Sequence, residues 1–360
     1  MRKGTLAIAL SLWTAAAPPA TGQFYRQHNL VADDAAFGPD LVDPNLVNGW
    51  GITASPTSPW WVSSNGTDLA KLYGGDGVPR ALVVAVAGGP TGIVFNGSTS
   101  FVVRNGPAAG PARFIFASED GRIRGWNPAV APAGQSLVMV DNSSAGAIYK
   151  GLAVALTASG NFLYATDFHN GRVAVFDGNL TPVTSPAGFV DPDLQKGFAP
   201  FGIQALRIGD QVQIFVAYAE QDEAAEDEIG GQGLGFVSRF ATDGTFLGRV
   251  ATRGQLNAPW GLALAPADFG KFSGHLLVGN FGDGQIHAYE ILANGHFEHR
   301  GYLKGEDQKP IQIDGLWAIA FGNGAAAGPT TTLFFAAGPG DESHGLFGKI
   351  DVVQPATQQP

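Results

Sequence analysis

The chain has 360 residues, with 31 aspartates and glutamates against 21 lysines and arginines, and a formal net charge of −10. This acidic balance argues against nucleic acid or an anionic membrane surface as a partner, because both repel a negative protein. The chain has no cysteine, which excludes thiol nucleophiles, iron–sulfur clusters and cysteine zinc sites.

The first 22 residues are typical of a secretory signal peptide. Arg2 and Lys3 precede the apolar run 6–13, and the small residues 20–22 suit a cleavage site. The apolar run is too short for a membrane span. We therefore expect an exported protein, secreted or periplasmic in a bacterium, that begins near Gln23 and has no membrane span. The polar tail 354–360 shows no anchor.

Composition predicts an all-β chain, since it carries 51 glycines and 23 prolines and no sustained helical periodicity. The stretch 257–303 shows the repeating unit, four strand-length pieces separated by turns rich in Gly, Asn and Asp. This pattern is typical of a four-stranded antiparallel meander. One such sheet has two apolar faces, so it needs copies of itself stacked on both sides.

Six copies of this unit follow one another, each opening on a small residue before an apolar pair. The opening residues are Gly51, Gly92, Gly151, Gly202, Gly261 and Ala318. Innermost strands crowd around a propeller axis, where a small residue lets backbones approach. The sixth copy has three strands, and the spare strand 24–31 can close the ring beside 346–350. We predict a monomeric six-bladed β-propeller over 23–353, with its N-terminal strand in the last blade.

Several motifs resemble those of a family of exported bacterial proteins of unknown function. They include DPNLVNGWG at 43–51, NAPWG at 257–261, LVGNFGDG at 277–284 and HGLFG at 344–348. The Gly-apolar-apolar strand starts are similar to those of NHL-type propellers. The resemblance implies a propeller fold and export but supplies no activity and no catalytic residue. The C-terminal sorting tail of some members is missing here.

We expect carboxylates along one face of the ring. In an antiparallel meander, the turn between the second and third strands lies at the same end of the sheet as the start of the first strand. All six of these turns therefore line one face, and each contains Asp or Glu. The candidate metal ligands on this rim are Glu119, Asp120, Asp167, Asn280, Asp283 and Asp341. Oxygen-rich groups around a channel mouth suit Ca²⁺, and nearby histidines extend the choice to Zn²⁺. The alternative is that Asp and Asn stand there because they cap tight turns. The sequence indicates no cofactor other than these two candidate metal ions.

Two histidines of the same turns are the candidate catalytic residues, His169 beside Asp167 and His344 beside Asp341. A carboxylate near an imidazole can orient it as a ligand or a general base. The other histidines near the fifth unit are interpreted as surface or packing residues. They are His275, His287, His296 and His299.

The residues just before the small ones form a candidate ligand-binding set. It consists of Trp50, Lys150, Phe201, Trp260 and Trp317. Aromatic rings around a mouth can stack on a sugar or another planar ligand, or they can wedge between neighbouring blades. Lys150 should need a partner among the acidic turns. The acidic stretch 220–233 suits a mobile lid or a weak cation site, although a solvated, partly disordered loop is the simpler interpretation.

These features predict a secreted binding propeller that presents one face of its ring to a small molecule, a glycan or a protein. One alternative is a metal-dependent hydrolase or lyase at the channel mouth, as in lactonase-type propellers, with His169 or His344 moving the proton. Another is a scaffold that docks proteins. Whether the chain is an enzyme stays open.

Overall fold

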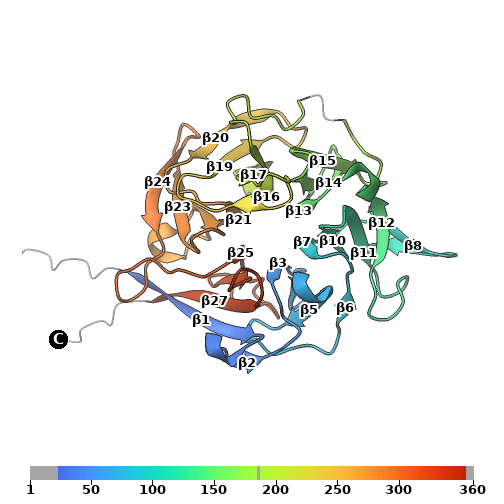
Figure 1. Ribbon diagram of the computed structural model, residues 1–360, viewed down its shortest axis with the longest axis horizontal. Coiled ribbons are helices and arrows are strands. Elements are labelled where there is room, and N and C mark those ends of the chain that lie inside the picture. The colour runs from blue at the N-terminus through green and yellow to red at the C-terminus, as the bar shows by residue number, and fades with distance from the viewer. Residues whose placement is uncertain (1–22, 185–186, 354–360) are drawn as a thin grey trace, which may run out of the picture.

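The computed structural model describes residues 23–184 and 187–353. The predicted signal peptide 1–22 and the polar tail 354–360 lie outside the described residues. In the described part, six sheets stand around one axis and form a β-propeller, as predicted (Figure 1). No helix in these ranges is long and apolar enough to cross a membrane.

The first three blades run from the innermost strand outwards. The first consists of β3 (Gly49–Thr53), β4 (Trp60–Ser64), β5 (Leu69–Tyr73) and β6 (Val84–Ala85). The second consists of β7 (Pro90–Phe95), β10 (Phe114–Ser118), β11 (Arg122–Trp126) and β12 (Leu137–Asp141), with an inserted hairpin of β8 (Val102–Asn105) and β9 (Ala108–Pro111). The third consists of β13 (Tyr149–Thr157), β14 (Gly160–Asp167) and β15 (Arg172–Asp177).

The other three blades complete the ring. The fourth consists of β16 (Phe198–Ile208), β17 (Gln211–Gln221), β19 (Phe236–Phe240) and β20 (Phe246–Thr252), and short β18 (Glu228–Ile229) also pairs with β17. The fifth consists of β21 (Pro259–Leu264), β22 (Leu276–Asn280), β23 (Ile286–Ile291) and β24 (Phe297–Tyr302). The sixth consists of β25 (Leu316–Phe321), β26 (Leu333–Ala337), β27 (Leu346–Val353), β1 (Phe24–Ala32) and β2 (Leu41–Val42). Short 3-10 turns are η1 (Ala35–Phe37), η2 (Asn65–Thr67), η3 (Ser143–Ala145) and η4 (Gly270–Phe272).

The N-terminal strand closes the ring, as the sequence predicts. β1 pairs antiparallel with β27 from Phe24 opposite Val353 to Ala32 opposite Leu346 (Figure 1). The Tyr25 ring is 2% exposed, and its hydroxyl donates a hydrogen bond to the Phe269 carbonyl of the fifth blade. The first and last segments of the propeller therefore share one sheet, and that sheet is anchored to its neighbour.

Small residues at the inner strand starts allow the backbones of neighbouring blades to touch. A Cβ atom on Gly202 would lie 2.1 Å from the Trp260 carbonyl oxygen, and one on Gly92 would lie 2.3 Å from the Leu152 amide nitrogen. Both distances are shorter than any tolerated contact, and both involve backbone atoms that cannot rotate away. Close approach at the axis is thus the physical reason for the repeated glycine.

Candidate functional site

Aromatic residues close the channel at the face where the inner strands begin. Trp317 lies at the centre of this group, with its ring centroid 3.5 Å from that of Trp50, 5.6 Å from Phe201 and 6.1 Å from Trp260. Phe281, in the turn after β22, adds a contact at 4.2 Å. The four predicted ring residues are at most 9% exposed. Four members of the predicted ligand-binding set therefore converge around Trp317. We call these four rings, Trp50, Phe201, Trp260 and Trp317, together with Phe281 the aromatic plug.

Two of the three indole N–H groups in this aromatic plug have a partner. Trp317 Nε1 donates to Asn48 Oδ1 at 2.8 Å, and Trp260 Nε1 donates to the Lys150 carbonyl at 3.0 Å. Trp50 Nε1 is buried and has no partner among the described residues. Asn48 is itself 2% exposed and donates through Nδ2 to Glu342 Oε2 at 2.6 Å. Asn48 therefore connects the plug to the carboxylates around it.

Lys150 is the fifth member of the predicted set and lies beside the plug. Its side chain is 2% exposed, and Nζ lies 2.7 Å from Glu119 Oε1 and 2.8 Å from Asp227 Oδ1. The ammonium also lies 5.4 Å from the Trp50 ring centroid, within range of a cation–π interaction. The expected acidic partner exists, because Glu119 belongs to the turn between β10 and β11.

Glu119 and Asp227 contact this ammonium, and Glu228 and Glu342 lie near enough to interact with it electrostatically. We call Lys150, Glu119, Asp227, Glu228 and Glu342 the mouth cluster. The lysine comes from the third blade, and the carboxyl groups come from the second, fourth and sixth blades. Burial lowers the pKa of Lys150, but the neighbouring acidic groups, Glu119 foremost, outweigh this effect and hold the pKa above its usual value. The ammonium therefore stays charged and cannot serve as a base near neutral pH.

Two carboxyl groups of the mouth cluster hold their protons more tightly than usual. Burial raises the pKa of Glu228 to about 8, although the nearby Lys150 charge lowers it and Glu342 raises it. Burial also raises the pKa of Glu342, against the opposing effects of Lys150 and of the Asn48 hydrogen bond. The main cause for both groups is burial, and the neighbouring carboxylates add a smaller contribution in the same direction. Near neutral pH, Glu228 is therefore protonated.

The acidic stretch 220–233 is exposed or half-buried throughout, as expected of a solvated loop, but defined contacts hold it in place and bring one of its acids to Lys150. Asp222 Oδ1 accepts hydrogen bonds from the backbone N–H of Glu226 at 2.8 Å and of Asp227 at 3.3 Å. Glu228 and Ile229 form β18 against β17. Asp227 then reaches Lys150 although its own side chain is 72% exposed. A local cap and one ion pair thus fix a segment whose composition alone favours disorder.

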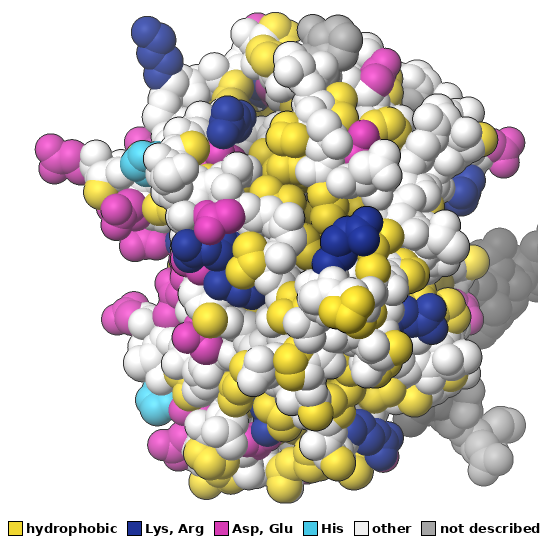
Figure 2. Space-filling model, turned by 90° about the vertical axis from the view of Figure 1, so that its right-hand side faces the viewer, with side chains coloured by type: hydrophobic (Ala, Val, Ile, Leu, Met, Phe, Trp, Pro, Cys, Tyr) yellow, Lys and Arg dark blue, Asp and Glu magenta, His cyan; other side chains and the backbone are white. Residues whose placement is uncertain are grey.

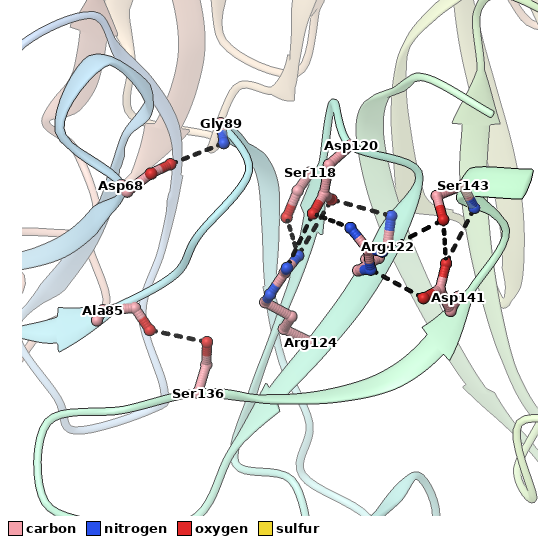
Figure 3. Close-up of polar contacts among 10 residues, drawn as sticks. All are labelled: Asp68, Ala85, Gly89, Ser118, Asp120, Arg122, Arg124, Ser136, Asp141 and Ser143. Carbon is pink, nitrogen blue, oxygen red and sulfur yellow. Dashed lines mark hydrogen bonds and ion pairs between the residues drawn. The ribbon is translucent and has the colours of Figure 1, made fainter. Parts of the chain in front are cut away.

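The predicted metal ligands are occupied by other partners. Asp120 Oδ2 accepts from Arg122 Nη1 at 2.9 Å and from Arg124 Nη2 at 2.8 Å, and Arg122 also reaches Asp141 (Figure 3). Asp167 is fully buried and accepts from Arg172 Nε at 3.0 Å.

The other predicted ligands serve their own turns or the lysine. Asn280 Nδ2 donates to Asp283 Oδ1 at 3.2 Å, and the same oxygen accepts from the Gln285 backbone N–H at 3.0 Å. Glu119 pairs with Lys150, and Asp341 is exposed. The described ranges contain no group of three or more His, Asp or Glu residues that could hold a metal ion. The rim metal site stays a prediction without geometric support.

The two candidate catalytic histidines lie apart. His169 is in the third blade, where Nδ1 lies 3.2 Å from the Ala225 carbonyl. His344 is in the sixth blade on the opposite side of the ring, where Nδ1 lies 2.9 Å from Asp33 Oδ2 (Figure 1). Neither forms the expected pair with the acid of its own turn, because Asp167 binds Arg172 and the acid beside His344 is Asp33.

Sequence reasoning missed four residues of this site, Asn48, Asp227, Glu228 and Glu342. Asn48 precedes Trp50 by two residues, and Glu342 stands in the sixth acidic turn next to the predicted Asp341. Asp227 and Glu228 are two of several acids in 220–233. The signals were therefore present, but no repeat pattern distinguishes the acid that points to the axis from its neighbours.

The fold and the mouth cluster define a six-bladed β-propeller with a closed, acidic channel mouth. The chain belongs to a family that includes uncharacterized proteins R648 and L690 of Acanthamoeba polyphaga mimivirus. R648 is 33% identical over 324 residues, covering 86% of this chain and 76% of the relative. L690 is 30% identical over 328 residues, covering 86% and 81%.

The expected membership of an exported bacterial family is wrong, because these relatives are viral proteins. No family model matches the chain. Among solved structures, a structural genomics protein of unknown function from Bacteroides thetaiotaomicron is similar, with a TM-score of 0.58 and 12% identity over 92% of this chain and 77% of that one. That likeness concerns the fold alone.

Proposed function

We propose that the chain is a binding propeller whose mouth cluster takes a cationic group, presented as a lysine or arginine by a basic segment of a partner protein. One observation carries the proposal. Two carboxylates contact a single ammonium and two further carboxyl groups interact with it electrostatically, so the cluster keeps a negative charge even while Glu228 holds a proton.

A partner's side chain suits this face better than an enclosed small molecule. The plug of Trp50, Trp260 and Trp317 fills the centre with the protein's own rings, so the mouth offers a surface and not a deep hollow. Asp227, at 72% exposure, marks where that surface meets solvent. Most acidic side chains in this view also lie on one face of the ring, at the left of Figure 2, where the ring is seen edge-on. Such a charge pattern favours a basic partner and speeds its encounter with the protein.

The experiment measures the binding of a fluorescein-labelled peptide of alternating lysine and glycine by fluorescence anisotropy at low salt. Glu342→Gln should weaken binding about tenfold, since one charge contact to a charged group is worth about 1.5–3 kcal/mol before screening. The matched control is Asp210→Asn in the turn between β16 and β17, at the opposite end of the blade. It removes the same charge and should leave affinity within about twofold.

Binding should also release a proton, because an incoming cation favours the ionised form of Glu228. Calorimetry at pH 7 in two buffers of different ionisation enthalpy measures this release. Equal affinities for the parent protein and Glu342→Gln, or tighter binding of a peptide of alternating glutamate and glycine, would overturn the proposal.

A further inference from the structure

Two histidines on the outer strands of the fifth blade lie next to each other, away from the mouth cluster. His287 in β23 has Nδ1 at 3.1 Å from Nε2 of His299 in β24. Their ring centroids are 5.2 Å apart and their planes meet at 45°. The two strands are paired antiparallel, with Tyr289 opposite His299 and Tyr302 opposite His287. The sheet therefore fixes the backbone positions of both imidazoles.

The separation of the two nitrogens fits coordination of one ion by both rings. Nitrogens bound to one transition-metal ion at about 2.0–2.1 Å are about 2.9 Å apart at a right angle and about 3.4 Å apart at the tetrahedral angle. The observed 3.1 Å lies between these values. A small rotation of the exposed ring would turn the contact between the two nitrogens into a chelate.

The histidine pair is open to solvent on the side of His299 and buried on the side of His287. His287 is 1% exposed, whereas His299 is exposed, so an ion can enter from solvent on the His299 side. The rings of Tyr302 and Tyr289 lie 6.0 Å from His287 and 5.3 Å from His299, respectively.

We propose that His287 and His299 together bind one divalent transition-metal ion, with water completing its coordination. The described ranges supply no group of three His, Asp or Glu residues for a metal, so this is a two-histidine site open to solvent. Imidazole suits Cu²⁺, Ni²⁺ and Zn²⁺, and the general order of stability places Cu²⁺ first. The proposal is independent of the basic partner at the mouth cluster.

The test is a titration of the full chain with CuCl₂, followed by calorimetry and electron paramagnetic resonance. The parent protein should bind one equivalent of Cu²⁺ with hyperfine splitting from two nitrogens. His299→Ala should weaken this equivalent at least 30-fold, and its exposed position makes loss of the fold no explanation. The matched control His296→Ala removes another exposed histidine at the start of the same hairpin strand and should change affinity less than twofold.

Other histidine–carboxylate pairs provide the competing outcome. His28 lies beside Asp40 and His344 beside Asp33, and either pair can take copper weakly. If the strongest equivalent survives in His299→Ala, or shows a single coordinating nitrogen, the proposal is wrong. If Zn²⁺ added to the metal-free parent protein shifts the His287 and His299 resonances together in NMR spectra, the two-histidine chelate is supported.

Discussion

The indole groups at the axis show how similar residues at equivalent positions can have different roles. Trp50 and Trp317 both stand just before the small residue of an inner strand, and both are at most 1% exposed. The Trp317 N–H binds Asn48, whereas the Trp50 N–H is buried without a partner in the described part of the chain. Equal packing therefore comes with unequal hydrogen bonding.

This difference predicts unequal costs for the same substitution. Trp317→Phe should cost about 1–3 kcal/mol more than Trp50→Phe, because it leaves the buried Asn48 oxygen unpaired while both variants lose the same ring atoms. Urea denaturation followed by circular dichroism measures the two free energies of unfolding. Equal losses, or a larger loss for Trp50→Phe, would show that Asn48 finds another donor.

Glu228 predicts a pH dependence of stability. Its pKa of about 8 in the folded protein lies above the ordinary 4.5, so the folded chain keeps a proton that the unfolded chain releases between these pH values. The stability from this group is complete below about pH 4.5 and is lost as the pH rises through about 8. Glu228→Gln, which is neutral throughout, should remove this loss, on the order of 1–2 kcal/mol after solvent screening.

Melting temperatures at pH 5 and pH 8.5 test this prediction. The parent protein should lose several degrees more than Glu228→Gln over that interval, while the exposed neighbour substitution Glu226→Gln should follow the parent. Parallel curves for the parent and Glu228→Gln would mean that the carboxyl group is ionised in the folded protein at neutral pH.

At the scale of strands and turns, the sequence predicts what repeats. Gly202 and Gly92 recur at strand starts because any larger residue collides with a neighbouring backbone, and that constraint is visible in each copy. The convergence of the tryptophans and Lys150 follows from the same register. The spare strand 24–31 is predictable because the sixth copy lacks a fourth strand.

Side-chain contacts that occur only once in the ring cannot be predicted from the repeat. His344 contacts Asp33, 311 residues away in the chain, and Lys150 contacts Asp227 across 77 residues. Composition alone favours disorder in 220–233, but Asp222 caps a turn and β18 adds to β17. Tertiary contacts therefore decide this segment, and local sequence cannot show them. For the same reason, the sequence suggests only that His287 and His299 are surface or packing residues, although the sheet makes them neighbours.

At the scale of the whole molecule, the ring is closed by one pair of strands from the two ends of the propeller. β1 and β27 pair residues that stand at the two ends of the propeller, and Arg26 faces Asp351 in that register. The chain contains no cysteine, so an engineered pair forms without competition. Opposed residues of paired strands have the spacing that a disulfide requires.

Arg26→Cys with Asp351→Cys should therefore stabilise the protein more than the same crosslink within one hairpin. The matched control is Glu290→Cys with Glu298→Cys, because these two residues are also register partners. Each double variant also removes exposed ion pairs, with Glu306 in the first case and with Arg300 in the control. In the chain-entropy picture the ring-closing crosslink gains on the order of 3 kcal/mol more, because it constrains a far longer loop. Denaturation of oxidised and reduced forms measures both gains. A smaller gain at the ring joint would show that β1 stays attached while the rest unfolds.

The stacked pair at the axis also has an optical consequence. Trp50 belongs to the first blade and Trp317 to the last, and their indoles lie 3.5 Å apart at 15°. Two identical chromophores so close share their excited states, so together they give a split band in the ultraviolet circular dichroism spectrum that neither gives alone. The molecule thus carries its own spectroscopic reporter of the seam between its first and last blades, and the contribution of this pair to the splitting disappears when that seam opens.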